Sequence, residues 1–259
     1  MSRIDKVFKK GSTALIAYVT VGYPSLEATM EVVPLLEHWG CDIVELGIPF
    51  SDPLADGGTI QQASDAALGN GVTSKLCFEL AGELSHKTEL PLVFMTYFNP
   101  VMHYGIDEFC HSSRQAGIDG LIIPDLPPEE GIELEAASRR HELDLIYLLA
   151  PTSTEARIRL VSGRSRGFIY LVSTTGTTGA REKLSAGLPG FVSRVREITG
   201  LPLCVGFGIS TPEQAGEVAA FADGVIVGSR IIQLLSAGDD YSSLGDLVKG
   251  LRCALDERG

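Results

Sequence analysis

Short apolar stretches rich in β-branched residues recur along the 259-residue chain, and segments with helix start and stop signals lie between them. Nearly continuous apolar runs are typical of parallel strands that helices cover on both faces. Half-exposed antiparallel strands would instead alternate apolar and polar residues. The expected strands are eight in number and lie at 14–20, 42–48, 91–97, 120–126, 144–150, 167–173, 202–208 and 224–229.

The segments between these strands begin as helices do. Thr211 is an expected cap, and Pro212 suits the first position of the helix that follows. Eight alternating units in about 250 residues predict an α/β fold, a single (β/α)8 TIM barrel domain spanning 1–259. A doubly wound open sheet is the alternative, but no Gly-x-Gly-x-x-Gly motif follows the first strand. An extra helix at 3–10 is expected to plug the other end of the barrel.

Composition and charge narrow the class of protein. The formal net charge of −12 argues against a nucleic-acid binder, which needs a basic face to neutralise phosphates. No apolar run is long enough for a membrane helix, and residues 1–10 lack the apolar core of a secretory signal, so we expect a cytoplasmic protein. The five cysteines form no Cys-x-x-Cys pair and the five histidines no zinc-binding spacing, so neither a disulfide framework nor a metal site is expected.

In a barrel of this kind, functional residues lie at the carboxyl ends of the strands and in the loops that follow. Glu45 is the clearest candidate, since it interrupts the apolar strand 43–47 with a carboxyl group. Burial raises the pKa of a carboxyl group, which would make Glu45 a proton donor near neutral pH. The alternative is a structural glutamate that forms a salt bridge in the core.

Asp56 lies in the loop after the same strand, beside Gly57. Asp-Gly is a common turn pair, so turn chemistry is the simpler interpretation of Asp56 taken alone. Together with Glu45 it becomes a candidate second carboxylate, carried by a loop and ionised. The segments 49–71 and 173–187 are unusually long for connections, which is more typical of lids at a barrel mouth than of spacers.

Glycines after the last two strands indicate a phosphate site. Gly206 and Gly208 follow the seventh strand, and Gly228 and Ser229 follow the eighth. Glycines let the backbone approach a ligand closely, and the N–H groups at helix starts bind anions. The recurrent phosphate site of these barrels uses the same two loops. Gly179 is expected to add a third donor loop, although a plain turn remains the alternative for each motif by itself.

Three further polar residues near expected strand ends are weaker candidates. Asn99 and Asp125 lie at the ends of the third and fourth strands, and Asp125 could simply cap the next helix. Tyr170 on the sixth strand would be a core residue in most proteins. An inward-facing tyrosine near the mouth nevertheless has a hydroxyl group to offer a ligand.

The segment ELGIPFSDPLADG at 45–57 closely resembles the signature of the tryptophan synthase alpha chain family. The resemblance runs through essentially the whole chain, and the long motif after the second strand is highly specific. Further matching segments are AYVTVGYP at 17–24, PDLP at 124–127, YLVS at 170–173, TG at 178–179 and GFGI at 206–209.

The resemblance implies a lyase of tryptophan biosynthesis that cleaves indole-3-glycerol phosphate to indole and glyceraldehyde 3-phosphate, a retro-aldol step without a cofactor. Glu45 would protonate C3 of the indole and relay the proton of the glycerol hydroxyl, and Asp56 would hydrogen-bond the indole N–H. Tyr170 would support both the indole ring and Glu45. The apolar clamp on the indole would consist of Ile60, Ile122 and Phe207. The phosphate donors would be Gly179, Gly208, Gly228 and Ser229.

The resemblance also implies a partner, the beta chain, in an αββα assembly that passes indole from one active site to the other. Pro49, Asp52 and Asn99 would face this partner, and pyridoxal phosphate would belong to the beta chain only. Two alternatives remain open from the sequence. The chain could be a catalytically weak activator of the beta chain, or a free-standing lyase that releases indole.

Two positions depart from the family pattern. Gly58 stands where the family usually has proline, which predicts a looser loop around Asp56. Thr177 stands where an apolar residue is usual, so closure of the segment 173–187 is expected to differ.

Overall fold

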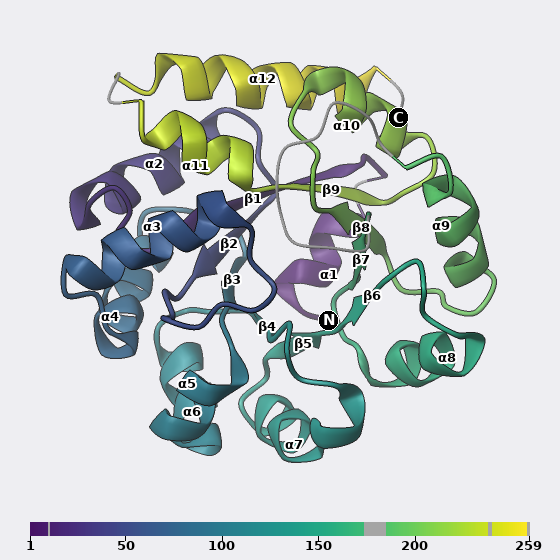
Figure 1. The fold of residues 1–259 in the computed structure, drawn as a ribbon, viewed down its shortest axis with the longest axis horizontal. Helices are drawn as coiled ribbons and strands as arrows, with labels where there is room; N and C mark the ends of the chain where they lie inside the picture. Colours follow the sequence, from purple (N-terminus) through teal and green to yellow (C-terminus); the bar gives the residue numbers. More distant parts are fainter. Residues whose placement is uncertain (10, 174–184, 238–239, 258–259) are drawn as a thin grey trace.

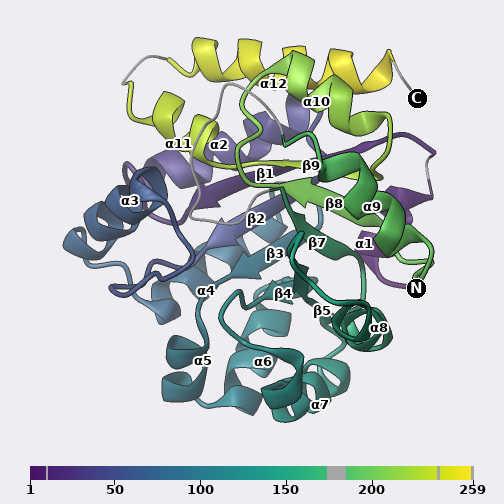
Figure 2. The same cartoon turned by 45° about the vertical axis from the view of Figure 1, so that its right-hand side comes forward.

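Parallel strands form the centre of the molecule, and the helices surround them (Figures 1 and 2). The computed structural model describes residues 1–9, 11–173, 185–237 and 240–257. The strands pair in the order β5-β4-β3-β2-β1-β9-β8-β7-β6, and each pair of neighbours is parallel. Their bounds are β1 Ala14–Thr20, β2 Ile43–Gly47, β3 Leu92–Met95, β4 Gly120–Ile122, β5 Asp144–Ile146, β6 Leu148–Leu149, β7 Ile169–Val172, β8 Leu203–Gly206 and β9 Gly224–Val227.

The two ends of this strand order, β5 and β6, are pieces of one expected strand separated only by Tyr147. The backbone N–H of Tyr147 donates to the Ser165 hydroxyl at 3.3 Å, while its carbonyl accepts from the Tyr170 N–H at 3.1 Å. β5 pairs with β4 and β6 pairs with β7, so the sheet closes on itself at this residue. The predicted (β/α)8 barrel is therefore confirmed, with one strand interrupted where it changes partners.

The helices of the described residues lie outside the strands and connect them (Figure 1). Thr211 accepts from the N–H of Gln214 at 3.3 Å and Pro212 is the first residue of α10, as the sequence predicts. The bounds are α1 Arg3–Phe8, α2 Leu26–His38, α3 Gly58–Gly69, α4 Ser74–Ser85, α5 Phe98–Tyr104, α6 Ile106–Gln115, η1 Pro128–Glu130, α7 Ile132–Arg140, α8 Glu155–Arg164, α9 Leu188–Arg196, α10 Pro212–Ala219, α11 Ser229–Leu235 and α12 Ser242–Asp256.

The extra N-terminal helix α1 packs against the amino ends of the strands. Ile4 is fully buried, and a β-carbon on Gly120 or Gly167 would lie 3.0 or 3.1 Å from its side chain. The ring of Phe8 packs on Phe168 with centroids 5.9 Å apart. Glycine at these strand starts thus lets α1 close the end of the barrel opposite the pocket, and the helix ends at Phe8, earlier than predicted.

Strand register decides which side chains share the barrel interior. Every residue of β1 and β2 is buried, which agrees with their apolar sequences. Tyr18 is paired with Glu45 across these strands, and Glu45 is paired with Val93 of β3. Because all the strands run in one direction, their carboxyl ends and the loops after them meet at one mouth.

Candidate active site

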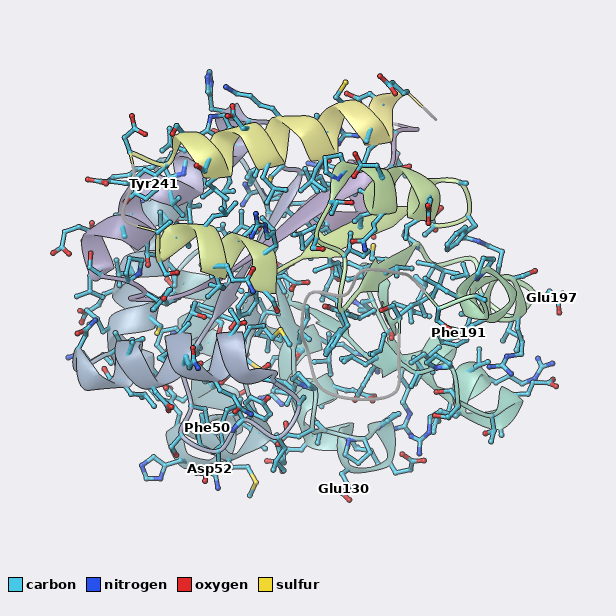
Figure 3. All side chains as sticks on the ribbon, turned by 45° about the horizontal axis from the view of Figure 1, so that its top comes forward. Phe50, Asp52, Glu130, Phe191, Glu197 and Tyr241 are labelled. Carbon is cyan, nitrogen blue, oxygen red and sulfur yellow. The ribbon has the colours of Figure 1, made fainter. Side chains whose placement is uncertain are left out.

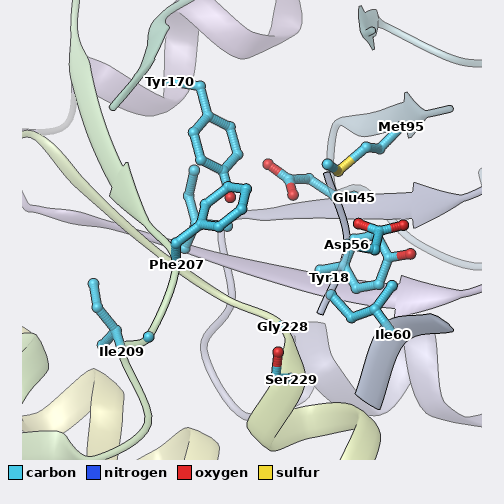
Figure 4. A pocket seen from close by; sticks show the side chains of 12 residues that line it. Tyr18, Glu45, Asp56, Ile60, Met95, Tyr170, Phe207, Ile209, Gly228 and Ser229 are labelled. Carbon is cyan, nitrogen blue, oxygen red and sulfur yellow. The ribbon is translucent and has the colours of Figure 1, made fainter. Parts of the chain in front are cut away.

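A pocket of about 440 Å³ lies at the carboxyl ends of the strands (Figure 4). It collects the predicted carboxylates, most of the predicted apolar clamp and the glycines after β8 and β9. Figure 4 shows Glu45 pointing toward Tyr170, and Asp56 beside Tyr18 and Ile60. The lining residues are Tyr18, Glu45, Asp56, Ile60, Met95, Tyr170, Phe207, Gly208, Ile209, Ile226, Gly228 and Ser229.

Glu45 projects from the middle of β2 and is completely buried. In the described part of the chain, neither of its carboxyl oxygens has a hydrogen-bond partner. Burial raises the pKa of this carboxyl group from its ordinary value of 4.5 to about 8. Glu45 therefore carries a proton at neutral pH and has it free to give to a ligand, and no core salt bridge forms within the described residues.

Asp56 comes from the loop between β2 and α3 and is also buried, with 6% of its surface exposed. Its N–H donates to the carbonyl of Pro53 at 3.2 Å, and its carbonyl accepts from the Gln61 side chain at 2.8 Å. The hydroxyl of Tyr97 hydrogen-bonds its carboxylate. These contacts hold Asp56 locally, so the looser loop that Gly58 predicts does not leave it unsupported.

Burial raises the pKa of Asp56 from 3.8 to about 6, and the hydrogen bond from Tyr97 opposes that rise. The carboxyl group of Asp56 is therefore mostly ionised at neutral pH, whereas that of Glu45 is mostly protonated. One pocket thus holds an acid and a carboxylate whose environments push their pKa values apart, the usual arrangement for paired acid and base roles.

Two tyrosines reach into the pocket because glycines stand at the ends of the neighbouring strands. A β-carbon on Gly47 would lie 2.1 Å from the hydroxyl oxygen of Tyr18. The equivalent atom on Gly206 would lie 2.3 Å from the hydroxyl oxygen of Tyr170. Only glycine leaves room for these hydroxyl groups to lie over the strand ends beside the two carboxyl groups.

The loop after β8 has the backbone shape that close approach to a ligand requires. Phe207 and Gly208 both have positive φ angles, 71° and 92°. The Ser173 hydroxyl donates to the carbonyl of Phe207, which ties this loop to the end of β7. The Phe207 ring packs edge-on to Tyr170, with centroids 5.7 Å apart. The apolar wall and the backbone of Gly208 therefore come from one fixed turn.

Gly228 and Ser229 lie where β9 runs into α11, with Gly228 as the N-cap. Backbone N–H groups in the first turn of a helix have no partner within the helix and favour an anion. Gly208 lines the same pocket, so the loops after β8 and β9 meet there. Gly179 and Thr177 lie outside the described residues.

Several predicted site residues do not line the pocket. Ile122 is fully buried at the end of β4 and does not line the pocket, whereas Met95, its register partner on β3, does. Asp125 accepts from the Phe98 N–H at 2.9 Å and thus holds the start of the preceding helix α5. Asn99 is exposed on the same helix.

The expected partner-facing residues lie on the loop after β2. Asp52 is exposed and accepts from the Ser51 hydroxyl at 2.6 Å, whereas Pro49 is buried at the base of the loop. Figure 3 shows Phe50 and Asp52 at the edge of the molecule in that view. Leu54, in the same loop, exposes 84% of its surface, and Met102 of α5 exposes 60%. Leu54 shares its loop with Asp52, and Met102 shares α5 with Asn99, so both lie on the segments that carry the expected partner-facing residues.

Tyr18, Met95 and Tyr97 are functional candidates that the sequence pattern alone does not reveal. Tyr18 and Met95 line the pocket, and Tyr97 contacts Asp56 from outside the lining. The available signal was positional, since all three lie in or next to expected strands near the mouth. An apolar or aromatic residue in a strand nevertheless looks like ordinary core until the register shows which face it occupies.

Comparisons with known proteins agree with this geometry. The sequence model of the tryptophan synthase alpha chain family matches residues 4–248. The chain is 55% identical to a tryptophan synthase alpha chain of Dehalococcoides mccartyi, over 99% of this chain and 100% of the relative. It is 49% identical to one from Geobacter sp., over 97% of each chain.

Solved structures show the same similarity. A structure from Aquifex aeolicus VF5 superposes with a TM-score of 0.92 at 40% identity, covering 98% of this chain and 99% of the other. A chain of Mycobacterium tuberculosis tryptophan synthase superposes with a TM-score of 0.92 at 41% identity, and the match covers 98% of each chain.

Among the helices of the described residues, none has the length and apolar character to cross a membrane.

Proposed function

Because the chain belongs to the tryptophan synthase alpha chain family, we propose that its pocket performs the alpha reaction of that family. This lyase reaction cleaves indole-3-glycerol phosphate to indole and D-glyceraldehyde 3-phosphate during tryptophan biosynthesis. The observation that carries the assignment of roles is the pair of buried carboxyl groups, one protonated and one ionised, in a single pocket.

Glu45 acts as the acid and then as the base. Its proton goes to C3 of the indole, which gives a ring cation in which the bond from C3 to the glycerol chain can break. The Glu45 carboxylate then takes the proton of the hydroxyl on the adjacent carbon. The electron pair of the breaking bond returns to the ring, the hydroxyl becomes the aldehyde, and Glu45 is protonated again. No cofactor in this chain is needed for this sequence.

Asp56 stabilises the cation that forms when C3 is protonated. Its carboxylate accepts a hydrogen bond from the indole N–H, where part of the positive charge resides. In a buried pocket the attraction between carboxylate and cation is stronger than in water, because the surroundings screen it less. Tyr170 supports the ring and Glu45, and Ile60 and Phe207 enclose the indole.

The phosphate end of the substrate is held by the backbone at Gly208 and Gly228, and by Ser229. A bound phosphate or sulfate ion in a crystal structure tests this placement. We expect the ion on these amides, and an ion held elsewhere in the barrel mouth would contradict it. Gly179 is proposed as a further donor from the lid.

The partner of the family is the beta chain, and we propose that the loop after β2 and the start of α5 dock against it in an αββα tetramer. Asp52 and Asn99 form the proposed interface, together with the exposed side chains of Leu54 and Met102, and Pro49, buried at the base of the loop, supports it from below. Pyridoxal phosphate belongs to the beta chain, which receives the indole.

Indole release by the purified chain, alone and with its beta chain, tests the proposal. The proposed function predicts slow release alone and faster release in the complex. No release from the complex would indicate an activator module, and rapid release without a partner would indicate a free-standing lyase.

A further inference from the structure

The hydroxyl group of Tyr97 joins two loops at the edge of the pocket. Tyr97 follows β3, and only 4% of its surface is exposed. Its oxygen accepts a hydrogen bond from the N–H of Ala55 at 3.0 Å, and the same hydroxyl hydrogen-bonds the carboxylate of Asp56. An ionised carboxylate can only accept, so the phenol proton is the one shared with Asp56.

We propose that Tyr97 is a positioning residue of the reaction, which holds the carboxylate of Asp56 in place and aimed into the pocket. This inference rests on the proposed function, because it assigns Asp56 the task of stabilising the indole cation. Tyr97 does not itself line the pocket, so it acts through Asp56 and not on the substrate.

The packing around Tyr97 makes its hydroxyl a fixed point. The Tyr97 ring lies 5.5 Å from that of Phe50, centroid to centroid, at the start of the loop that carries Asp56. The next residue, Phe98, donates its N–H to Asp125 at the end of β4. The ends of β3 and β4 are thereby linked to each other, and Tyr97 transmits this rigidity to the loop after β2.

The charges around Asp56 explain why a donor is needed there. Tyr97 faces it from the end of β3 and Tyr18 from β1, while the nearby Glu45 of β2 is protonated at neutral pH. Tyr18 itself accepts a hydrogen bond from the Thr20 hydroxyl at 3.3 Å. No cation contributes to the pKa of Asp56 among the described residues, so the Tyr97 hydroxyl is the group that offsets burial.

The first test replaces Tyr97→Phe, which removes the hydroxyl and keeps the ring. Carbon-13 titration of labelled aspartate carboxyl groups reports the pKa of Asp56 without any substrate, and the signal lost in Asp56→Asn assigns it. We expect the pKa of Asp56 to rise by about one unit, the size expected for a lost hydrogen bond to a charged group. An unchanged pKa in folded Tyr97→Phe would overturn the proposal.

The second test measures turnover. Tyr97→Phe should lower kcat about tenfold at neutral pH, of which about twofold comes from the protonated fraction of Asp56 and the rest from its lost alignment. KM should stay nearly unchanged, because the phosphate loops are untouched. Tyr104→Phe is the matched control, since its hydroxyl contacts Ser112 away from the pocket, and it should leave both constants unchanged. In an Asp56→Asn background, Tyr97→Phe should have almost no further effect, and independent, additive losses would contradict action through Asp56.

The two proposals fail separately. Failure of the proposed function would appear as unchanged indole release in Glu45→Gln, whatever the titration of Asp56 shows. Failure of the Tyr97 proposal would appear in the carboxyl titration, even in a chain that releases indole normally.

Discussion

The two carboxyl groups of the pocket are held by different means. Glu45 stands on β2, where paired strands on both sides fix the backbone and its carboxyl oxygens have no partner among the described residues. Asp56 stands on a loop, where Gln61, Pro53 and Tyr97 fix it by hydrogen bonds. The paired strand orients Glu45 without any polar contact, whereas the loop depends on hydrogen bonds to orient Asp56.

This difference sets the chemistry of each group. Burial without a partner raises the pKa of Glu45 to about 8, and burial opposed by a hydroxyl donor leaves that of Asp56 at about 6. A single pocket can therefore hold an acid and a base of the same chemical type when the two groups differ in depth of burial and in hydrogen bonding.

The largest effect is expected from Glu45→Gln, which keeps the size of the side chain and removes its proton transfer. Indole release should fall about a thousandfold while the substrate still binds, because general acid–base catalysis is typically worth 10²–10⁴. Glu135→Gln is the control, since Glu135 is a buried glutamate outside the pocket that accepts from Tyr147. Release that persists in Glu45→Gln would mean that Glu45 is structural.

Asp56→Asn should have the next largest effect, a loss of about a hundredfold in kcat at neutral pH. The amide keeps a hydrogen-bond acceptor for the indole N–H but loses the negative charge that stabilises the ring cation. Asp52→Asn, in the same loop but exposed, controls for changes in loop charge. If Asp56→Asn were as active as Asp52→Asn, Asp56 would have no part in the reaction.

The pH profile of kcat/KM for the whole enzyme should be bell-shaped, with about a tenfold change per unit on each limb. Below a pH of about 6 Asp56 becomes protonated and loses its charge, and above about 8 Glu45 loses the proton that it must donate. In Asp56→Asn the acid limb should disappear, and its persistence would assign that limb to another group.

Gly58→Pro is expected to have the smallest effect. Gly58 is the first residue of α3, a position that suits proline, and a β-carbon there would contact nothing within 4 Å. The free energy of unfolding should rise by about 0.5–1 kcal/mol, mainly through a less flexible unfolded chain. Thermal unfolding measures this, with Gly69→Ala at the other end of α3 as the control. A marked rise in kcat in Gly58→Pro would show that the hydrogen bonds of Asp56 do not by themselves hold its carboxylate in position.

The sequence by itself determined the fold class, because apolar runs of strand length between helix signals leave few other ways to bury themselves. It also indicated Glu45, since a carboxyl group inside an apolar strand needs a reason to be there. The glycines after the last two strands could be predicted as a pocket feature because parallel strands place their loops at a common mouth.

Only the tertiary structure decided the rest. At the break in the strand, the N–H of Tyr147 donates to a hydroxyl from Ser165, and the pocket wall includes Met95 of β3 but not its register partner Ile122. The contact of Tyr97 with Asp56 joins residues 41 positions apart. Hydrophobic periodicity fixes which segments are buried, but the direction of a hydroxyl group or the partner of a buried carboxyl group is set by neighbours far away in the chain.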